Sequence, residues 1–355
     1  MAIEKNGRMS LGNYQSEHIE AGGLKLNFQR TCRVPAGQLN SLPAGLGSFP
    51  VFRVKDFRSG CPKEWRDEGY FFPMYRQEAM WINFRGNYYP KAVIVGAGNI
   101  NAVNGKPFNP SKDKIRLTEE ERKKAADNLE IKLEKEQNYL VVPPQPWIDG
   151  WKAADGKVYQ FVAAEMGSGE TVEGQITGEE KIGGIQLVIY EAKKKLVPEK
   201  SLHEHIVAGS WHYGAKSIGD FEDCGELCCV ELCCAADEPS FGPASVKAMA
   251  ASPAETRAAK RAVRSMGFGR GGEIDQKIYP DLHGLEVWKD KPSAVEVFYM
   301  VSSEDFKQVT GYEAPPTPVT YEVYQHHGYP WFELNDQNLG DSKGSDIFEK
   351  LKPVG

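Results

Sequence analysis

The chain has 355 residues, 41% of them hydrophobic and 26% charged, and its formal net charge is −6 at pH 7. This length and composition predict one large or two ordinary folded domains and exclude wholesale disorder. The mild acidity excludes a general phosphate binder, so we expect no nucleic-acid partner. The sequence has neither an apolar leader nor an apolar run long enough for a bilayer, so we expect no transmembrane segment. Seven cysteines without a secretory signal favour reduced thiols and a cytoplasmic location.

The first half of the chain predicts short strands separated by glycine-rich turns. Leu24, Leu26 and Phe28 recur at every second position, which is typical of a strand with one buried face. The aromatic stretch 60–75 has no regular pattern and predicts irregular structure. Similar apolar runs predict further strands at 51–54, 79–84, 91–95, 139–142, 156–163, 171–177 and 184–190.

Three sequence signals predict helices. Thr118 and Glu121 form a capping box that opens a charged helix to about residue 137. Ser252, followed by proline and by Glu255, opens a second helix to about residue 265. A third helix covers 303–310 and ends at Gly311. Strands are predicted at 273–279 and 294–301.

The predicted fold class is therefore α+β and β-rich, with antiparallel sheets arranged as a sandwich or barrel and two or three peripheral helices. We predict a β-rich domain over 1–200 with a charged helical excursion at 118–137. A Cys/His-rich connecting segment follows at 201–251. A smaller α+β domain with an extended C-terminal tail covers 252–355.

Two glycine-rich segments resemble ligand-binding loops. The run from Lys91 to Gly98 is like the start of a dinucleotide-binding fold, but Asn101 stands where the third glycine belongs and the next residues do not favour a helix. We therefore expect no nucleotide there. The segment 267–272 is predicted to be a plain connector, with an anion-binding nest under Arg270 as the alternative.

The segment 203–234 concentrates residues that bind metals. Imidazole and thiolate ligands together suit a tetrahedral zinc site, although the C-x3-C-C-x3-C-C spacing matches no closed zinc motif. Disulfide or redox use and small buried residues are the alternatives. Cys32 and Cys61 are expected to be isolated core or surface residues. The candidate ligands are His203, His205, His212, Cys224, Cys228, Cys229, Cys233 and Cys234.

Carboxylates near two tryptophans are the second candidate site. Asp149 lies between Trp147 and Trp151, and a carboxylate pair beside tryptophan faces would suit glycoside hydrolysis. The simpler interpretation is that Asp149 is a turn residue bonded to its own backbone and that the tryptophans are core. The partners considered for Asp149 are Glu165, Glu173 and Glu179.

One helix face is basic. Arg257, Lys260, Arg261 and Arg264 recur at helical spacing, which predicts a solvated outer face, with contact to nucleic acid, an acidic membrane or an acidic neighbour as the alternatives.

Several stretches give the chain a family resemblance. GLKLNFQRTCRVP, FFPMYRQEAMWINF, NINAVNGKPF, YLVVPPQPWIDG, VYQFVAAEMGSG, MGFGRGGEIDQKIYPD and PPTPVTYEVYQHHGYPWFEL resemble a widespread group of uncharacterised, mainly bacterial proteins. The resemblance extends from Gly23 to Leu334 and is weakest at 118–137 and 201–240. It implies a single architecture and transfers no activity, ligand or catalytic residue.

The sequence carries no complete catalytic signature, so whether the chain is an enzyme stays open. We predict a soluble, non-catalytic structural or binding protein that self-associates or docks a partner through edge strands and extended termini. The apolar, proline-rich tail, which contains Pro315 and Trp331, would pack on its own chain or on a neighbouring subunit. The alternative is a metal-dependent enzyme using the Cys/His segment, or a carboxylate hydrolase around Asp149.

Overall fold

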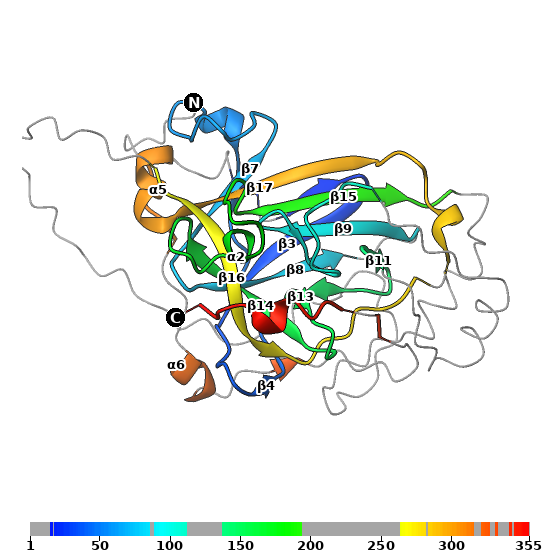
Figure 1. Cartoon of the computed structure of the whole chain (residues 1–355). Helices are drawn as coiled ribbons and strands as arrows, with labels where there is room; N and C mark the ends of the chain where they lie inside the picture. Colours follow the sequence, from blue (N-terminus) through cyan, green and yellow to red (C-terminus); the bar gives the residue numbers. More distant parts are fainter. Residues whose placement is uncertain are drawn as a thin grey trace, which may run out of the picture. The chain divides into compact units, whose positions relative to one another are not determined.

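The structure is a computed structural model of the chain (Figure 1). It describes residues 15–16, 18–85, 89–111, 137–193, 263–281, 283–315, 321–326, 331–332, 341–342 and 344–354. The predicted helix 118–137, the Cys/His segment and most of the predicted helix 252–265 therefore lie outside the described residues.

The described part is α+β and β-rich, as predicted, and antiparallel pairing dominates one large sheet. A second, two-stranded sheet joins β5 to β18. The strands are β1 (Gln15–Ser16), β2 (Ile19–Ala21), β3 (Leu24–Thr31), β4 (Leu39–Asn40), β5 (Leu42–Pro43), β6 (Val51–Arg53), β7 (Tyr70–Met74), β8 (Ala79–Arg85), β9 (Lys91–Ala97), β10 (Ile100–Asn101), β11 (Leu140–Val142), β12 (Trp147–Ile148), β13 (Gly150–Lys152), β14 (Val158–Glu165), β15 (Ile185–Glu191), β16 (Ser265–Ile274), β17 (Ala294–Ser302) and β18 (Trp331–Phe332).

The main path of the large sheet runs β1-β6-β7-β17-β16-β14-β8-β3-β2, and β15 joins β17 to β9. Strand β17 has several neighbours because its two halves pair differently. Its first half pairs antiparallel with β15, and its second half pairs parallel with β7 and, at residues 300–301, antiparallel with β16. Strands from the first 200 residues and from residues 265–302 therefore share one hydrogen-bonded sheet.

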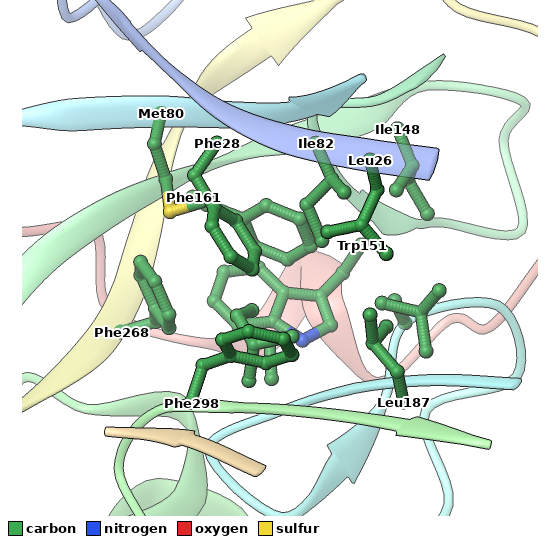
Figure 2. Packing of buried hydrophobic residues seen from close by; sticks show 14 of the residues in the cluster. Leu26, Phe28, Met80, Ile82, Ile148, Trp151, Phe161, Leu187, Phe268 and Phe298 are labelled. Carbon is green, nitrogen blue, oxygen red and sulfur yellow. The ribbon is translucent and has the colours of Figure 1, made fainter. Parts of the chain in front are cut away.

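The core lies between two parts of this sheet. Figure 2 shows Leu26 and Phe28 of β3 on one side of the cluster, with Leu187 of β15 and Phe298 of β17 on the other. Phe28 and Phe298 meet edge to face with ring centroids 4.8 Å apart. The alternate residues that predicted β3 thus point into the core, and burial of this apolar surface is the main stabilising contribution.

Three helices accompany the strands among the described residues: α2 (Val172–Thr177), α5 and α6. Helix α5 (Ser303–Thr310) has the predicted bounds and ends at Gly311, whose φ of 81° is the left-handed cap. Helix α6 covers Tyr321–His326. Short 3-10 turns cover Val54–Phe57, Leu285–Val287 and Phe348–Lys350.

The strand predicted at 171–177 is wrong, because this segment is helix α2 (Val172–Thr177). Thr171 caps the helix by accepting the amide of Gly174 at 3.1 Å, and Gly178 ends it in the left-handed conformation. The cap and the terminal glycine outweigh the alternation that indicated a strand.

The connector predicted at 267–272 is also wrong, because these residues lie inside β16. Strand β16 begins at Ser265, so the predicted helix cannot reach that residue, and the strand predicted at 273–279 extends only to Ile274. Met266 and Phe268 point into the core. A Cβ on Gly269 would lie 2.2 Å from the Val354 side chain. The glycines thus let the C-terminal residues pack directly on the strand, which leaves no anion-binding nest.

The C-terminal residues are part of this body. The amide of Val354 donates to the carbonyl of Arg270 at 2.9 Å, and Pro353 bridges to the same strand. The ring of Phe348 lies 5.9 Å from that of Trp151. The end of the described chain therefore stabilises the sheet.

Buried glutamine side chains replace missing strand neighbours. Each of five glutamines accepts a hydrogen bond from one main-chain amide and donates to a main-chain carbonyl. Because a primary amide has both a donor and an acceptor, it satisfies backbone groups where strands stop pairing. These residues are Gln137, Gln145, Gln160, Gln186 and Gln276, all at most 4% exposed.

Within the part of the chain that the structure describes, no helix has the length and apolar character to cross a membrane.

Candidate functional site

Asp149 lies in a sealed position between β12 and β13. Its amide donates to Oε1 of Gln276 at 3.3 Å, and its carbonyl accepts the amide of Phe161 at 2.9 Å. Gln276 also donates to the carbonyl of Trp147 at 2.9 Å. The main chain around Asp149 is therefore fixed from both sides, and the residue is not in an exposed turn.

The carboxyl group of Asp149 is the least satisfied acid among the described residues. The residue is 0% exposed, and neither carboxyl oxygen has a hydrogen-bond partner in the described structure. Burial raises its pKa to about 8, and contact with its own main-chain amide opposes this rise. Asp149 is consequently a neutral acid at pH 7, without the solvent contact that a hydrolase acid needs.

The carboxylates considered as partners for Asp149 do not converge on it. Glu165 lies four residues beyond Phe161 on β14, which corresponds to about 13 Å, and it pairs with Arg264 at 3.1 Å. Glu173 is buried and accepts the amides of residues 181–183 at 2.9–3.3 Å. Glu179 is exposed and pairs with Lys181. No acid pair for glycoside hydrolysis is present at Asp149 in the described part.

All eight candidate zinc ligands, His203, His205, His212, Cys224, Cys228, Cys229, Cys233 and Cys234, lie outside the described residues. Among the described residues, no three His, Cys, Asp or Glu side chains gather as a metal site. Cys32 and Cys61 are buried thiols. Burial raises the pKa of Cys32 to about 12 and that of Cys61 to about 11, so both thiols are poor nucleophiles at neutral pH.

Only Arg264 of the predicted basic face is described. It donates to Glu165 at 3.1 Å and to Asp305 at 3.0 Å, and it pairs with Glu304. The charge of Arg264 is therefore matched within the protein. Arg257, Lys260 and Arg261 lie outside the described residues.

A polar surface on the sheet is the most distinctive arrangement that the sequence did not reveal. On β3 and β8, Asn27 lies opposite Asn83, and Gln29 lies opposite Trp81. Trp147 of β12 lies on the other side of Asn83. Leu26, Phe28 and Ile82 alternate with these residues and point into the core. These five uncharged side chains, the polar tryptophan face, therefore share the opposite side of the sheet: Asn27, Gln29, Trp81, Asn83 and Trp147.

The polar tryptophan face is buried beneath residues 37–47, which we call the strap. Leu42 of the strap packs with Trp81 and Trp147. The two indole rings meet edge to face at 6.0 Å. The hydroxyl of Ser48, next to the strap, accepts from Asn27 at 3.2 Å and from Gln29 at 2.9 Å. Asn27 is 1% exposed and Trp81 is 7% exposed, and a Cβ on Gly45 of the strap would lie 3.4 Å from the Trp81 ring.

The C-terminal tail reaches the same strap. In the second sheet, Trp331 of β18 pairs with Pro43 and Phe332 pairs with Leu42. The tyrosine hydroxyl of Tyr75 also donates to the carbonyl of Pro315 at 2.8 Å. The described parts of the tail therefore pack on their own chain, which was one of the two predicted arrangements.

No protein-family model, curated protein or solved structure matches the chain. The resemblance to a bacterial group accordingly stays a prediction.

Proposed function

We propose that this protein is a non-catalytic binding protein that self-associates or docks a partner by strand addition through its C-terminal tail. The observation that supports this most directly is the antiparallel pairing of β18 with β5. Main-chain pairing of this kind is how extended peptides add to an exposed strand. A cytoplasmic location is part of the proposal and agrees with Cys32 and Cys61 being thiols outside any disulfide.

The geometry of the tail favours exchange between copies. Each strand of the second sheet contributes only two residues, so this pairing is easily replaced. About 20 residues separate Thr310 from Trp331, and six of them form helix α6, so this segment spans up to ~55 Å. The same tail can therefore reach β5 of its own chain or β5 of a second copy.

Light scattering after size exclusion tests the exchange. We expect the full chain to form dimers or larger species, and Phe332→Pro to shift it toward the monomer, because proline removes a main-chain donor from β18. Thr317→Pro is the matched control, since it lies in the proline-rich stretch before β18 and should leave assembly unchanged. A monomer at every concentration, or assembly unaffected by Phe332→Pro, would contradict the proposal.

The alternative is a metal-dependent enzyme that uses the Cys/His segment, with zinc as cofactor. Elemental analysis of protein purified without a metal-affinity tag separates the two functions. The binding protein is expected to carry zinc and iron well below one ion per chain. About one zinc per chain, lost when the paired cysteines are replaced by serine, would favour the metalloenzyme.

A further inference from the structure

A buried lysine meets an aspartate from the C-terminal part of the chain at the end of β13. Lys152 is the last residue of this strand, and its side chain is 0% exposed. Its Nζ donates to the carbonyl of Gly156 at 2.7 Å and to Oδ2 of Asp341, which lies 189 residues further along the chain. The other carboxylate oxygen, Oδ1, accepts the amide of Ile278 at 2.9 Å. An amine and a carboxyl group are therefore held in direct contact.

Main-chain hydrogen bonds fix both residues in this arrangement. The carbonyl of Lys152 accepts the amide of Ser345 at 2.9 Å. Directly after Asp341, the amide of Ser342 donates to the carbonyl of Ile278 at 2.8 Å. Two groups that the fold holds in contact react as parts of one molecule, which removes the entropic cost of bringing them together.

Proton transfer within the ion pair produces the reactive forms of both groups. The Lys152 side chain is sealed from solvent, and keeping an ammonium group out of water is costly. Moving one proton from Nζ to Oδ2 of Asp341 removes both charges and leaves a neutral amine beside a neutral acid. A desolvated neutral amine is a nucleophile.

The surrounding hydrogen bonds suit amide formation. The lone pair of Lys152 Nζ attacks Cγ of Asp341, and the Nζ–Cγ bond forms while the amide of Ile278 stabilises the negative charge on Oδ1. A second proton then passes from Nζ to Oδ2, the Cγ–Oδ2 bond breaks, and water leaves. The Asp341 side chain is 30% exposed, so this water has a path to solvent. The step needs no oxidant and no further reactant.

The amide product keeps the two outer hydrogen bonds of the ion pair. Its remaining N–H donates to the carbonyl of Gly156, and its oxygen Oδ1 accepts from the amide of Ile278. The donor and the acceptor of the new amide are thus both satisfied. An ion pair has the same neighbours but retains a buried charge on Lys152.

We propose that Lys152 and Asp341 form an intramolecular isopeptide bond. This modification would fix Asp341, and with it the C-terminal residues that pack on the sheet, covalently to β13. A cross-link between positions so far apart in the sequence restricts the unfolded chain, so it should also make the protein resist unfolding. The proposal does not depend on assembly through β18.

Intact-mass spectrometry of the purified full-length chain, after denaturation, tests the bond. We expect a mass lower than that of the sequence by one water. Trypsin should release one branched peptide that joins the segment containing Lys152 to the segment containing Asp341. Lys152→Arg keeps the positive charge, but a guanidinium does not attack a carboxyl carbon, so this variant should have the full mass of its sequence. Asp341→Ala should do the same.

Lys157→Arg is the matched control. Lys157 also pairs with two acids, Asp155 and Glu273, but its side chain is 37% exposed, so the variant should still lack one water. A wild-type chain with the full mass of its sequence, after long incubation of the folded protein at neutral pH, overturns the proposal. A loss of water that persists in Lys152→Arg comes from dehydration elsewhere, and it overturns the proposal as well.

Discussion

Replacing Asp149 by asparagine is expected to stabilise the protein above pH 8 by several kcal/mol. Burial raises the pKa of Asp149 from an ordinary 3.8 to about 8 in the folded protein. The folded state therefore binds a proton more tightly than the unfolded chain. The free energy of unfolding is highest below pH 4 and falls as the pH rises toward 8, by roughly 6 kcal/mol at most. Asparagine never ionises and should abolish this dependence.

Urea unfolding at pH 5, 7 and 9 measures the effect. The stability of Asp149→Asn should already exceed that of wild type by roughly 1.5 kcal/mol at pH 5, where the unfolded wild-type chain has lost the proton that the folded protein keeps, and the difference should be largest at pH 9. Asp346→Asn makes the same change at an exposed carboxylate and should show no comparable gain. Equal pH profiles for wild type and Asp149→Asn would show that Asp149 is solvated or ion-paired.

The free energy of unfolding of the Asp149→Asn variant should still fall as the pH rises, although by less than that of wild type. The remaining decrease comes from Glu78. Its carboxylate lies 3.5 Å from Arg30, and both side chains are buried. Burial raises the pKa of Glu78 to about 7, although the charge of Arg30 and the amide of Tyr75 oppose the rise. Stability therefore declines between about pH 4.5 and pH 7 and is level above that.

The sequence predicted the fold class because apolar alternation is a local signal. Leu24, Leu26 and Phe28 identify β3, and Ser303 with Gly311 bounds α5. The same logic failed at 267–272, where glycines resemble a loop but allow the C-terminal residues to approach β16. Such an approach depends on residues about 80 positions away, which no local pattern records.

The polar tryptophan face illustrates the same limit at the level of a site. Asn27 and Gln29 alternate with Leu26 and Phe28, and Trp81 and Asn83 alternate with Ile82, so each strand displays a polar side in the sequence. Only the register of β3 against β8 and of β12 against β8 brings the two sides together. Asp149 was singled out by its tryptophan neighbours, but its complete burial results from Gln276 and β14.

Replacing Asp281 by alanine is expected to cost roughly 4 kcal/mol or more, because it leaves several buried donors unpaired. Its carboxylate accepts the Tyr139 hydroxyl at 2.5 Å and the Trp288 indole at 2.8 Å. It also accepts the main-chain amides of His283 and Gly284. Asp281, Tyr139 and Trp288 are all nearly inaccessible. Burial and the neighbouring carboxylate raise the pKa of Tyr139, so its hydroxyl remains a donor.

Chemical denaturation of three variants separates these contributions. Tyr139→Phe removes one donor together with its bond and should cost only about 1 kcal/mol. Asp290→Ala changes an exposed acid that lies 3.7 Å from Lys193. The free energy of unfolding of this variant should lie within about 0.5 kcal/mol of that of wild type. The loss of stability caused by Asp281→Ala should be much larger than the loss caused by either of these variants. A loss for Asp281→Ala no larger than that for Tyr139→Phe would mean that the indole and amide donors find water when the carboxylate is removed.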